Sequence, residues 1–167
     1  MGEAWDGGDT PHLNPLPPGE RKLSIKTILT ELQARLLMEA RTGHLATADP
    51  RGTPHVIPVC YAFDGQAIYS VLDQKPKRTA LIRLKRVRNI QSNSRVALVV
   101  DHYDEDWRHL WYVLVHGDAL VLEVGQEQTA AVRLLRQKYP QYQGMDIDQN
   151  PVIKIVPRRV TSWAGET

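Results

Sequence analysis

The chain has 167 residues, of which 42% are hydrophobic and 24% charged, and its formal net charge is +2. These values are ordinary for one soluble globular domain, and the small net charge gives no reason to expect nucleic acid or an anionic membrane as a partner. Cys60 is the only cysteine, which excludes an intramolecular disulfide and any cysteine-cluster metal site. No apolar run approaches the roughly 18 residues of a membrane span, and the N-terminus has no apolar segment of the secretory kind, so we expect a cytoplasmic protein.

The first part of the sequence differs in composition from the rest. Residues 1–20 contain four glycines and four prolines and little apolar surface. Burial therefore cannot offset the entropy of ordering this stretch. We expect residues 1–22 to form a disordered leader and residues 23–167 to form one folded domain.

The first half of this domain is predicted to be a helix followed by a β-meander. Apolar residues recur at helical spacing from 24 to 41, and Thr30 with Gln33 matches a capping box, so the ordered helix can begin there. Period-two patterns then predict three strands, at 44–49, 53–63 and 66–72. The Asp64-Gly65 pair between the last two is a strong hairpin signal.

The second half is predicted to mix helices with longer strands. We expect a helix over 76–93, strands at 95–100 and 110–123 with a bend at Gly117, a helix from Gly125 to 139, and a closing strand at 152–163 in which Pro157 indicates an edge or bulge. Six strands joined mainly by hairpins, with three helices, indicate a mainly β protein: an antiparallel barrel with peripheral helices.

The sequence lacks the common catalytic signatures, namely GxGxxG after a strand, GxxxxGK[ST], HExxH and GxSxG. It does contain a basic segment where the third strand gives way to a helix. Lys75, Lys77 and Arg78 begin this segment, and no acidic residue occurs from 75 to 100. Helix N-terminal amides together with cations favour a phosphate. A solvated basic helix face is the alternative; nucleic acid is disfavoured because no aromatic residues are interleaved.

Three further features leave alternatives open. Pro58 cannot donate to a strand ladder, so its strand is an edge or is bulged, with or without a ligand beside it. Trp107 and Trp111 offer flat surfaces that suit either a planar ring or a dimer interface. Acids and histidines are mixed over 101–111, but no spacing there is diagnostic of a metal site, so we predict no metal.

Two passages carry a family resemblance: GHLATADPRGTPHVIPVCYAFDGQAIYSVLDQKPKR and RVRNIQSNSRVALVVDHYDEDW. They resemble the pyridoxamine 5'-phosphate oxidase-like superfamily, and most of all its coenzyme F-420 (deazaflavin)-dependent oxidoreductase branch. The resemblance implies a six-stranded antiparallel split β-barrel of the FMN-binding type, and a homodimer with its cofactor at the subunit interface. The chain lacks the C-terminal substrate-binding segment of true pyridoxamine-phosphate oxidase, so the reaction of that enzyme is not implied.

The resemblance also assigns cofactor-binding residues. The phosphate would lie against Lys75, Lys77 and Arg78. The ring system would lie along the second and third strands, at Ile57, Pro58, Val59 and Ser70. The partner subunit would close the ring face with Trp107 and Trp111.

These features predict an oxidoreductase that transfers a hydride between bound coenzyme F-420, or alternatively FMN, and a small planar or conjugated organic substrate. No catalytic acid or base is identified; water, Tyr61 or Tyr69 could supply a proton. A deazaflavin would need an additional basic groove, which a set of later cations could form if they faced the cleft; otherwise FMN is favoured. That set comprises Arg83, Lys85, Arg86 and Arg88. The alternatives are a non-catalytic flavin- or haem-binding protein for storage or sensing, and a purely structural dimer.

Overall fold

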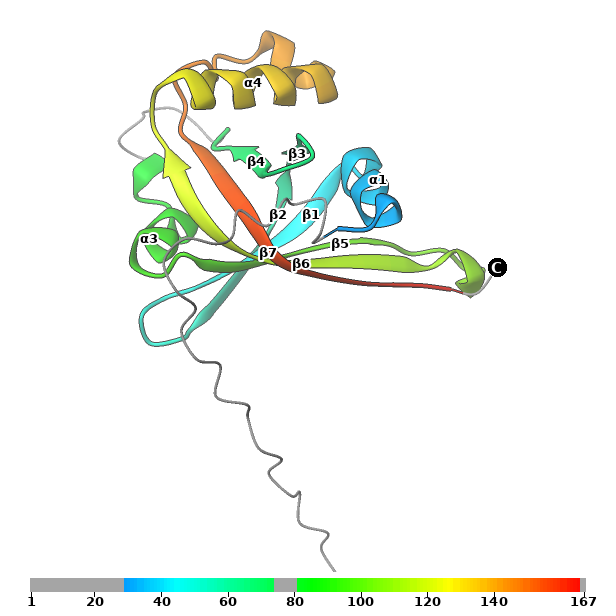
Figure 1. Cartoon of the computed structure of the whole chain (residues 1–167). Coiled ribbons are helices and arrows are strands. Elements are labelled where there is room, and N and C mark those ends of the chain that lie inside the picture. Colours follow the sequence, from blue (N-terminus) through cyan, green and yellow to red (C-terminus); the bar gives the residue numbers. More distant parts are fainter. Residues whose placement is uncertain (1–28, 74–80, 166–167) are drawn as a thin grey trace, which may run out of the picture.

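The computed structural model describes residues 29–73 and 81–165, which form one curled antiparallel sheet with helices packed against it (Figure 1). The cationic residues at 75, 77 and 78 and the predicted leader therefore lie outside the described residues. In chain order the elements are α1 (Glu31–Glu39), β1 (Thr42–Ala48), β2 (Pro54–Cys60), β3 (Ala62–Phe63), β4 (Ile68–Val71), α3 (Lys85–Ser92), β5 (Arg95–His102), η2 (Trp107–His109), β6 (Trp111–Leu122), α4 (Gln126–Lys138), η3 (Pro140–Gly144) and β7 (Val152–Ala164). None of the helices within these two ranges is long and apolar enough to cross a membrane.

The sheet has seven strands in the order β2-β1-β5-β6-β7-β4-β3, and every pairing is antiparallel. β2 and β3 lie at opposite edges, although only Tyr61 separates them in sequence. A flat sheet cannot bring its two edges within one residue of each other, so the sheet must curl into a half-barrel. This agrees with the expected split-barrel architecture.

The expected count of six strands is wrong, because the predicted strand 53–63 breaks at Tyr61. The Tyr61 side chain is fully buried. The Tyr61 backbone makes hydrogen bonds to a side chain instead of to a neighbouring strand. The Tyr139 hydroxyl accepts a hydrogen bond from the Tyr61 N–H (3.1 Å) and lies 2.7 Å from the Tyr61 carbonyl oxygen. These two contacts satisfy the polar groups that a continuous ladder would otherwise use.

The turns and caps form as the sequence predicts. Thr30 and Gln33 make the reciprocal capping box of α1. In the β3–β4 hairpin, Asp64 Oδ1 accepts hydrogen bonds from the backbone N–H groups of Gln66 and Ala67 (2.7 Å each). Gly65 has a φ of 92°. The predicted helix over 76–93 is interrupted in its described part: Leu81 and Ile82 are helical, Leu84 leaves the helical conformation (φ −58°, ψ 141°), and α3 begins at Lys85.

The long strand β6 bends where the sequence places Gly117. Gly117 pairs with Pro157 while His116 pairs with Arg159, so Arg158 is the extra residue of a bulge in β7. A Cβ at Gly117 would lie 2.6 Å from the carbonyl oxygen of Val156, so only glycine allows the two strands to approach this closely. The bend turns the second half of β6 and β7 away from the first half, as Figure 1 shows.

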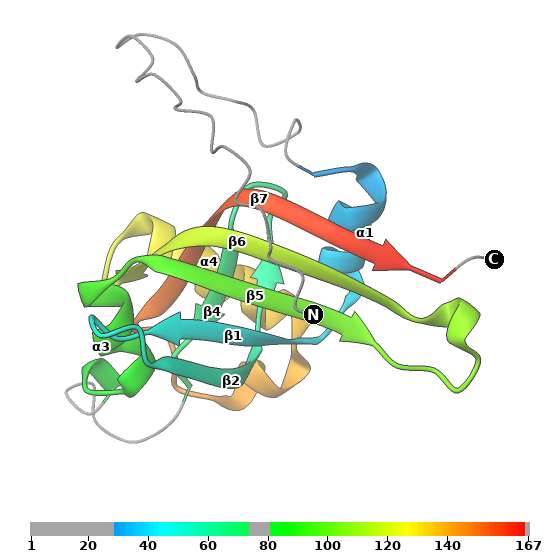
Figure 2. The ribbon, with the colours of Figure 1, turned by 90° about the horizontal axis from the view of Figure 1, so that it is seen from below.

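The helices cover one side of the sheet only. One core cluster packs α1 and α3 against β1, β5 and β6, and a second lies under α4. The opposite face of β2, β1, β5, β6 and β7 has no described helix over it (Figure 2). This open face carries Val56, Tyr112 and Trp163, which are 58%, 40% and 50% exposed.

Candidate functional site

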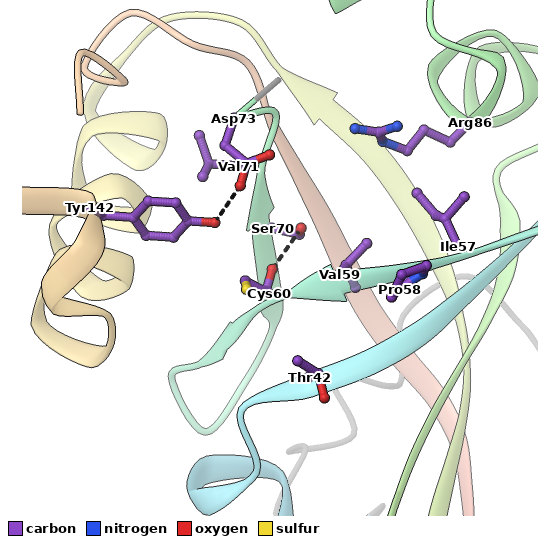
Figure 3. A pocket seen from close by; sticks show the side chains of 10 residues that line it. All are labelled: Thr42, Ile57, Pro58, Val59, Cys60, Ser70, Val71, Asp73, Arg86 and Tyr142. Atoms are coloured by element: carbon purple, nitrogen blue, oxygen red, sulfur yellow. Dashed lines mark hydrogen bonds between the residues drawn. The ribbon is translucent and has the colours of Figure 1, made fainter. Parts of the chain in front are cut away.

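A pocket of about 390 Å³ lies between β2, β4, α3 and η3 (Figure 3). Its wall on the sheet side is the edge strand β2, whose free edge has no described strand beside it. Ten residues line the pocket: Thr42, Ile57, Pro58, Val59, Cys60, Ser70, Val71, Asp73, Arg86 and Tyr142. The pocket therefore combines an apolar wall with a few polar side chains, as small-molecule sites usually do.

Four of the residues predicted to lie along the cofactor ring come together here: Ile57, Pro58, Val59 and Ser70. Pro58 has no N–H to donate, and its position on an edge strand means that no ladder bond is lost. The Ser70 hydroxyl donates to the carbonyl oxygen of Cys60 (2.8 Å), which ties β4 to the end of β2. Contact of these residues with a cofactor stays a prediction.

One end of the pocket is cationic. Arg86 extends from α3 toward it (Figure 3), and partial burial lowers the pKa of its guanidinium, against a smaller opposing effect of Asp73. Lys85 points elsewhere and pairs with Asp49 (3.2 Å). Arg83 and Arg88 are exposed and do not line the pocket. Of the four cations considered for an additional basic groove, only Arg86 therefore faces this cleft.

The opposite end is formed by a hydrogen-bonded pair (Figure 3). The Tyr142 hydroxyl donates to Asp73 Oδ2 (2.8 Å), and burial followed by the neighbouring carboxylate raises the pKa of this phenol. Tyr61 and Tyr69, considered as proton donors, do not line the pocket. Their hydroxyls donate to the Leu37 carbonyl and to Glu127.

Sequence reasoning missed five residues of the first pocket: Thr42, Cys60, Val71, Asp73 and Tyr142. Asp73 and Tyr142 are 69 positions apart and neither belongs to a recognisable motif. The one available signal was the position of Asp73 directly after the third predicted strand, next to the basic segment. The cations of that segment, Lys75, Lys77 and Arg78, lie outside the described residues, so the predicted phosphate contact stays a prediction.

The two predicted tryptophans lie on other parts of this chain. Trp107 is in η2 and is 70% exposed, whereas Trp111 begins β6 and stacks on His102 with ring centroids 6.2 Å apart. Both are at the far end of the long strands β5, β6 and β7 (Figure 1), and neither lines the pocket. Within 29–73 and 81–165, no group of three or more His, Cys, Asp and Glu residues is arranged to hold a metal ion.

A second cavity, of about 610 Å³, adjoins the first. The two share Thr42, Cys60, Asp73 and Tyr142, so together they form one continuous cleft. The other residues that line the second cavity are Arg41, Tyr139, Pro140, Gln141 and Met145.

A curled antiparallel half-barrel with a pocket on its proline-containing edge strand places this chain in the split-barrel class of β proteins. The family model for pyridoxamine 5'-phosphate oxidase matches residues 31–162, and the chain belongs to this family. The resemblance seen in the sequence is thereby confirmed.

Several known proteins are similar to the chain. The 5a,11a-dehydrotetracycline/5a,11a-dehydrooxytetracycline reductase of Streptomyces rimosus is 28% identical over 138 residues, which cover 82% of this chain and 84% of that protein. The structure of a conserved hypothetical protein from Mycobacterium tuberculosis is 25% identical, with a TM-score of 0.65 over 82% of this chain and 86% of that one.

Two more distant structures share the fold. One is an F-420 reductase, 24% identical with a TM-score of 0.58 over 80% of this chain and 98% of that one. The other is a haem storage protein from Vibrio cholerae, 13% identical with a TM-score of 0.61 over 78% and 89% of the two chains. The similar proteins thus include named reductases and a named haem protein.

Proposed function

We propose that this chain is an oxidoreductase that transfers a hydride between a bound flavin or deazaflavin and a small planar, conjugated organic substrate. The observation that carries the proposal is that the first pocket has an apolar strand wall and, at one end, a single partly buried arginine, Arg86. The curated reductase from Streptomyces rimosus supports the reaction class. When bound, the cofactor would supply the hydride chemistry itself.

The residues present fit such a cofactor. Ile57, Pro58 and Val59 give an apolar edge for a flat ring, and Arg86 gives a charge-assisted donor for a phosphate at the opposite end from Tyr142. Asp73 is already engaged by the Tyr142 hydroxyl, which lowers its repulsion toward an anionic ligand. The chain thus provides binding, orientation and partial exclusion of water around the ring.

The cation arrangement favours FMN over coenzyme F-420. A deazaflavin with an oligoglutamate tail should be bound by several cations along a groove, but of the four cations in question only Arg86 lines the cleft. We therefore expect FMN to bind more tightly. Coenzyme F-420 would need cations beyond Arg86, from Arg41 at the second cavity or from outside the described residues.

The proposal includes a homodimer built on the open sheet face. Val56, Tyr112 and Trp163 leave large apolar surfaces uncovered there, and a second copy of the chain would bury them. In such a dimer Trp107 and Trp111 could approach a cofactor only in the other copy, because neither lines the pocket of its own chain. We also propose a cytoplasmic location, since a lone cysteine fits a reducing compartment.

The test is direct binding followed by turnover. The purified protein is titrated with FMN and with coenzyme F-420 while absorbance and fluorescence are recorded, and then assayed with each reduced cofactor against a panel of quinones and enones. Saturable binding with cofactor-dependent turnover is expected. Failure to bind either cofactor contradicts the proposal.

A storage or sensing role is the second candidate. It is favoured by the pairing of Asp73 with Tyr142, because the one carboxylate and the one phenol that line the pocket are engaged with each other. Tight binding of a flavin or of haem without turnover on any substrate of the panel would support it.

The dimer is tested separately by sedimentation velocity. Val56→Glu places a carboxylate in the proposed interface and should shift the protein to monomer. Met38→Glu, at an exposed methionine on α1, is the matched control and should not. A wild-type monomer at all concentrations would contradict this part of the proposal.

A further inference from the structure

We propose that the second cavity is a substrate subsite that selects planar, conjugated molecules carrying an anionic oxygen group, such as a carboxylate or an enolate. The inference rests on the proposed function, because it takes the first pocket to hold the cofactor. It adds a substrate class and the residue that recognises it, Arg41.

The position of the cavity suits a substrate. Arg86 and Tyr142 lie at opposite ends of the first pocket (Figure 3), so a phosphate at Arg86 directs the ring toward Tyr142 and Cys60. The second cavity begins at these same two residues. A molecule inside it would therefore lie next to the ring, as hydride transfer requires.

Two charged side chains line the cavity, Arg41 and Asp73, and the Asp73 carboxylate accepts a hydrogen bond from the Tyr142 hydroxyl. Around Arg41 the cations outnumber the carboxylates. Arg41 lines the cavity and donates from Nη1 to the Lys138 carbonyl, and no carboxylate of the described residues pairs with it. Lys138 lies just behind, with Nζ 4.3 Å from the centroid of the Tyr61 ring and donating to the Ala40 carbonyl (2.6 Å). Burial, and then repulsion by Arg41, lowers the pKa of Lys138 to about 8. An anionic ligand would balance this local excess of positive charge.

The remaining walls suit a flat, apolar body. Tyr139 and Tyr142 meet edge to face, with centroids 5.5 Å apart at 64°, and Pro140 and Met145 complete the surface. The Tyr139 hydroxyl is held by the backbone of Tyr61, so its ring is fixed before any ligand arrives. Fixed aromatic walls with a cation at the rim recognise a conjugated ring that bears one anionic group.

A pair of probes of equal shape tests the inference: 2-naphthoate, which is anionic, and 2-naphthamide, which is neutral. Binding of each is measured by fluorescence on the full-length protein, with and without saturating FMN. A charge-assisted hydrogen bond from a partly exposed arginine predicts about tenfold tighter binding of the naphthoate. FMN should not displace it, because the two ligands would occupy adjacent cavities.

The variants separate Arg41 from general effects. Arg41→Gln should abolish the preference for naphthoate, Arg41→Lys should retain much of it, and Arg35→Gln, at an exposed arginine on α1, should leave it unchanged. Met145→Trp fills the cavity and should weaken the binding of both probes. Each variant should keep its FMN affinity within about twofold, because none of the changed residues lines the first pocket.

Equal binding of the two probes, equal loss in the Arg35 control, or displacement of naphthoate by FMN would overturn the inference. Failure of the proposed function gives a different result: neither FMN nor coenzyme F-420 binds, while the Arg41-dependent preference for naphthoate persists.

Discussion

Arg86 offers the sharpest test of how the first pocket recognises its ligand. Its guanidinium is partly buried at the α3 end of the pocket, and its pKa is lowered because burial disfavours the charged form. A phosphate beside it would restore the stabilisation that the side chain lost on leaving water. Arg86→Gln keeps much of the side-chain length but removes the charge.

The magnitude follows from one charge-assisted hydrogen bond. Such bonds contribute about 1.5–3 kcal/mol, and the lower part of this range applies because the side chain keeps some solvent contact. A loss of about 1.5–2 kcal/mol corresponds to about a 10–30-fold increase in Kd for FMN. Riboflavin has the same ring without the phosphate, so its Kd should change by less than about twofold.

The assay is flavin fluorescence quenching, run as a cycle of two proteins and two ligands. Arg88→Gln, two residues further along α3 at an exposed position, is the matched control and should affect neither ligand. An equal loss for FMN and riboflavin would show that Arg86 supports the pocket structurally, and no loss for either would show that the phosphate lies elsewhere. Both results would refute the assignment. For a deazaflavin the same cycle is run with its phosphate-free chromophore.

Three further changes test the fold around the site. Tyr139→Phe leaves the buried backbone of Tyr61 without partners and should cost about 2 kcal/mol, a Tm decrease of about 4–8 °C by calorimetry. Gly117→Ala forces a Cβ against a carbonyl of β7 and should cost about 1–3 kcal/mol in urea unfolding, whereas Gly144→Ala, in open space, should not. Hydrogen bonds from backbone N–H groups and Lys85 lower the pKa of Asp49 from 3.8 to about 2, so the contribution of this carboxylate to stability is present above pH 3.8 and is lost as the pH falls toward 2. Asp49→Asn lacks this contribution, so its stability should fall less than that of the wild type between these pH values in acid titrations.

Local signals in the sequence predicted local structure correctly. The capping box at Thr30, the Asp64-Gly65 hairpin and the bend at Gly117 each depend on residues within a few positions of one another. Pro58 predicted an edge or bulged strand, because proline has no N–H to donate to a neighbouring strand, and β2 lies at an edge of the sheet. The apolar wall of the pocket was predicted through the family resemblance and not by these local signals.

The break in the predicted strand 53–63 was beyond such reasoning. Tyr61 continues the alternating pattern of its neighbours, and the hydroxyl that replaces its ladder bonds comes from Tyr139, 78 positions later. The hydrogen bond between Tyr142 and Asp73 likewise joins residues that are far apart in the sequence, by 69 positions. Contacts of this kind become visible only after the topology has brought the segments together.

The break at Tyr61 also explains why the site lies where it does. Because the chain leaves β2 there and re-enters the sheet at the opposite edge as β3, β2 keeps a free edge that faces β4, α3 and η3 across the pocket. Tyr139 stabilises this break and at the same time lines the second cavity. Its hydroxyl also lies 2.5 Å from the carbonyl oxygen of Arg41, whose side chain we assign to anion recognition. Closure of the half-barrel and the shape of the proposed substrate subsite therefore depend on one side chain, so Tyr139→Phe should weaken naphthoate binding as well as lower the Tm.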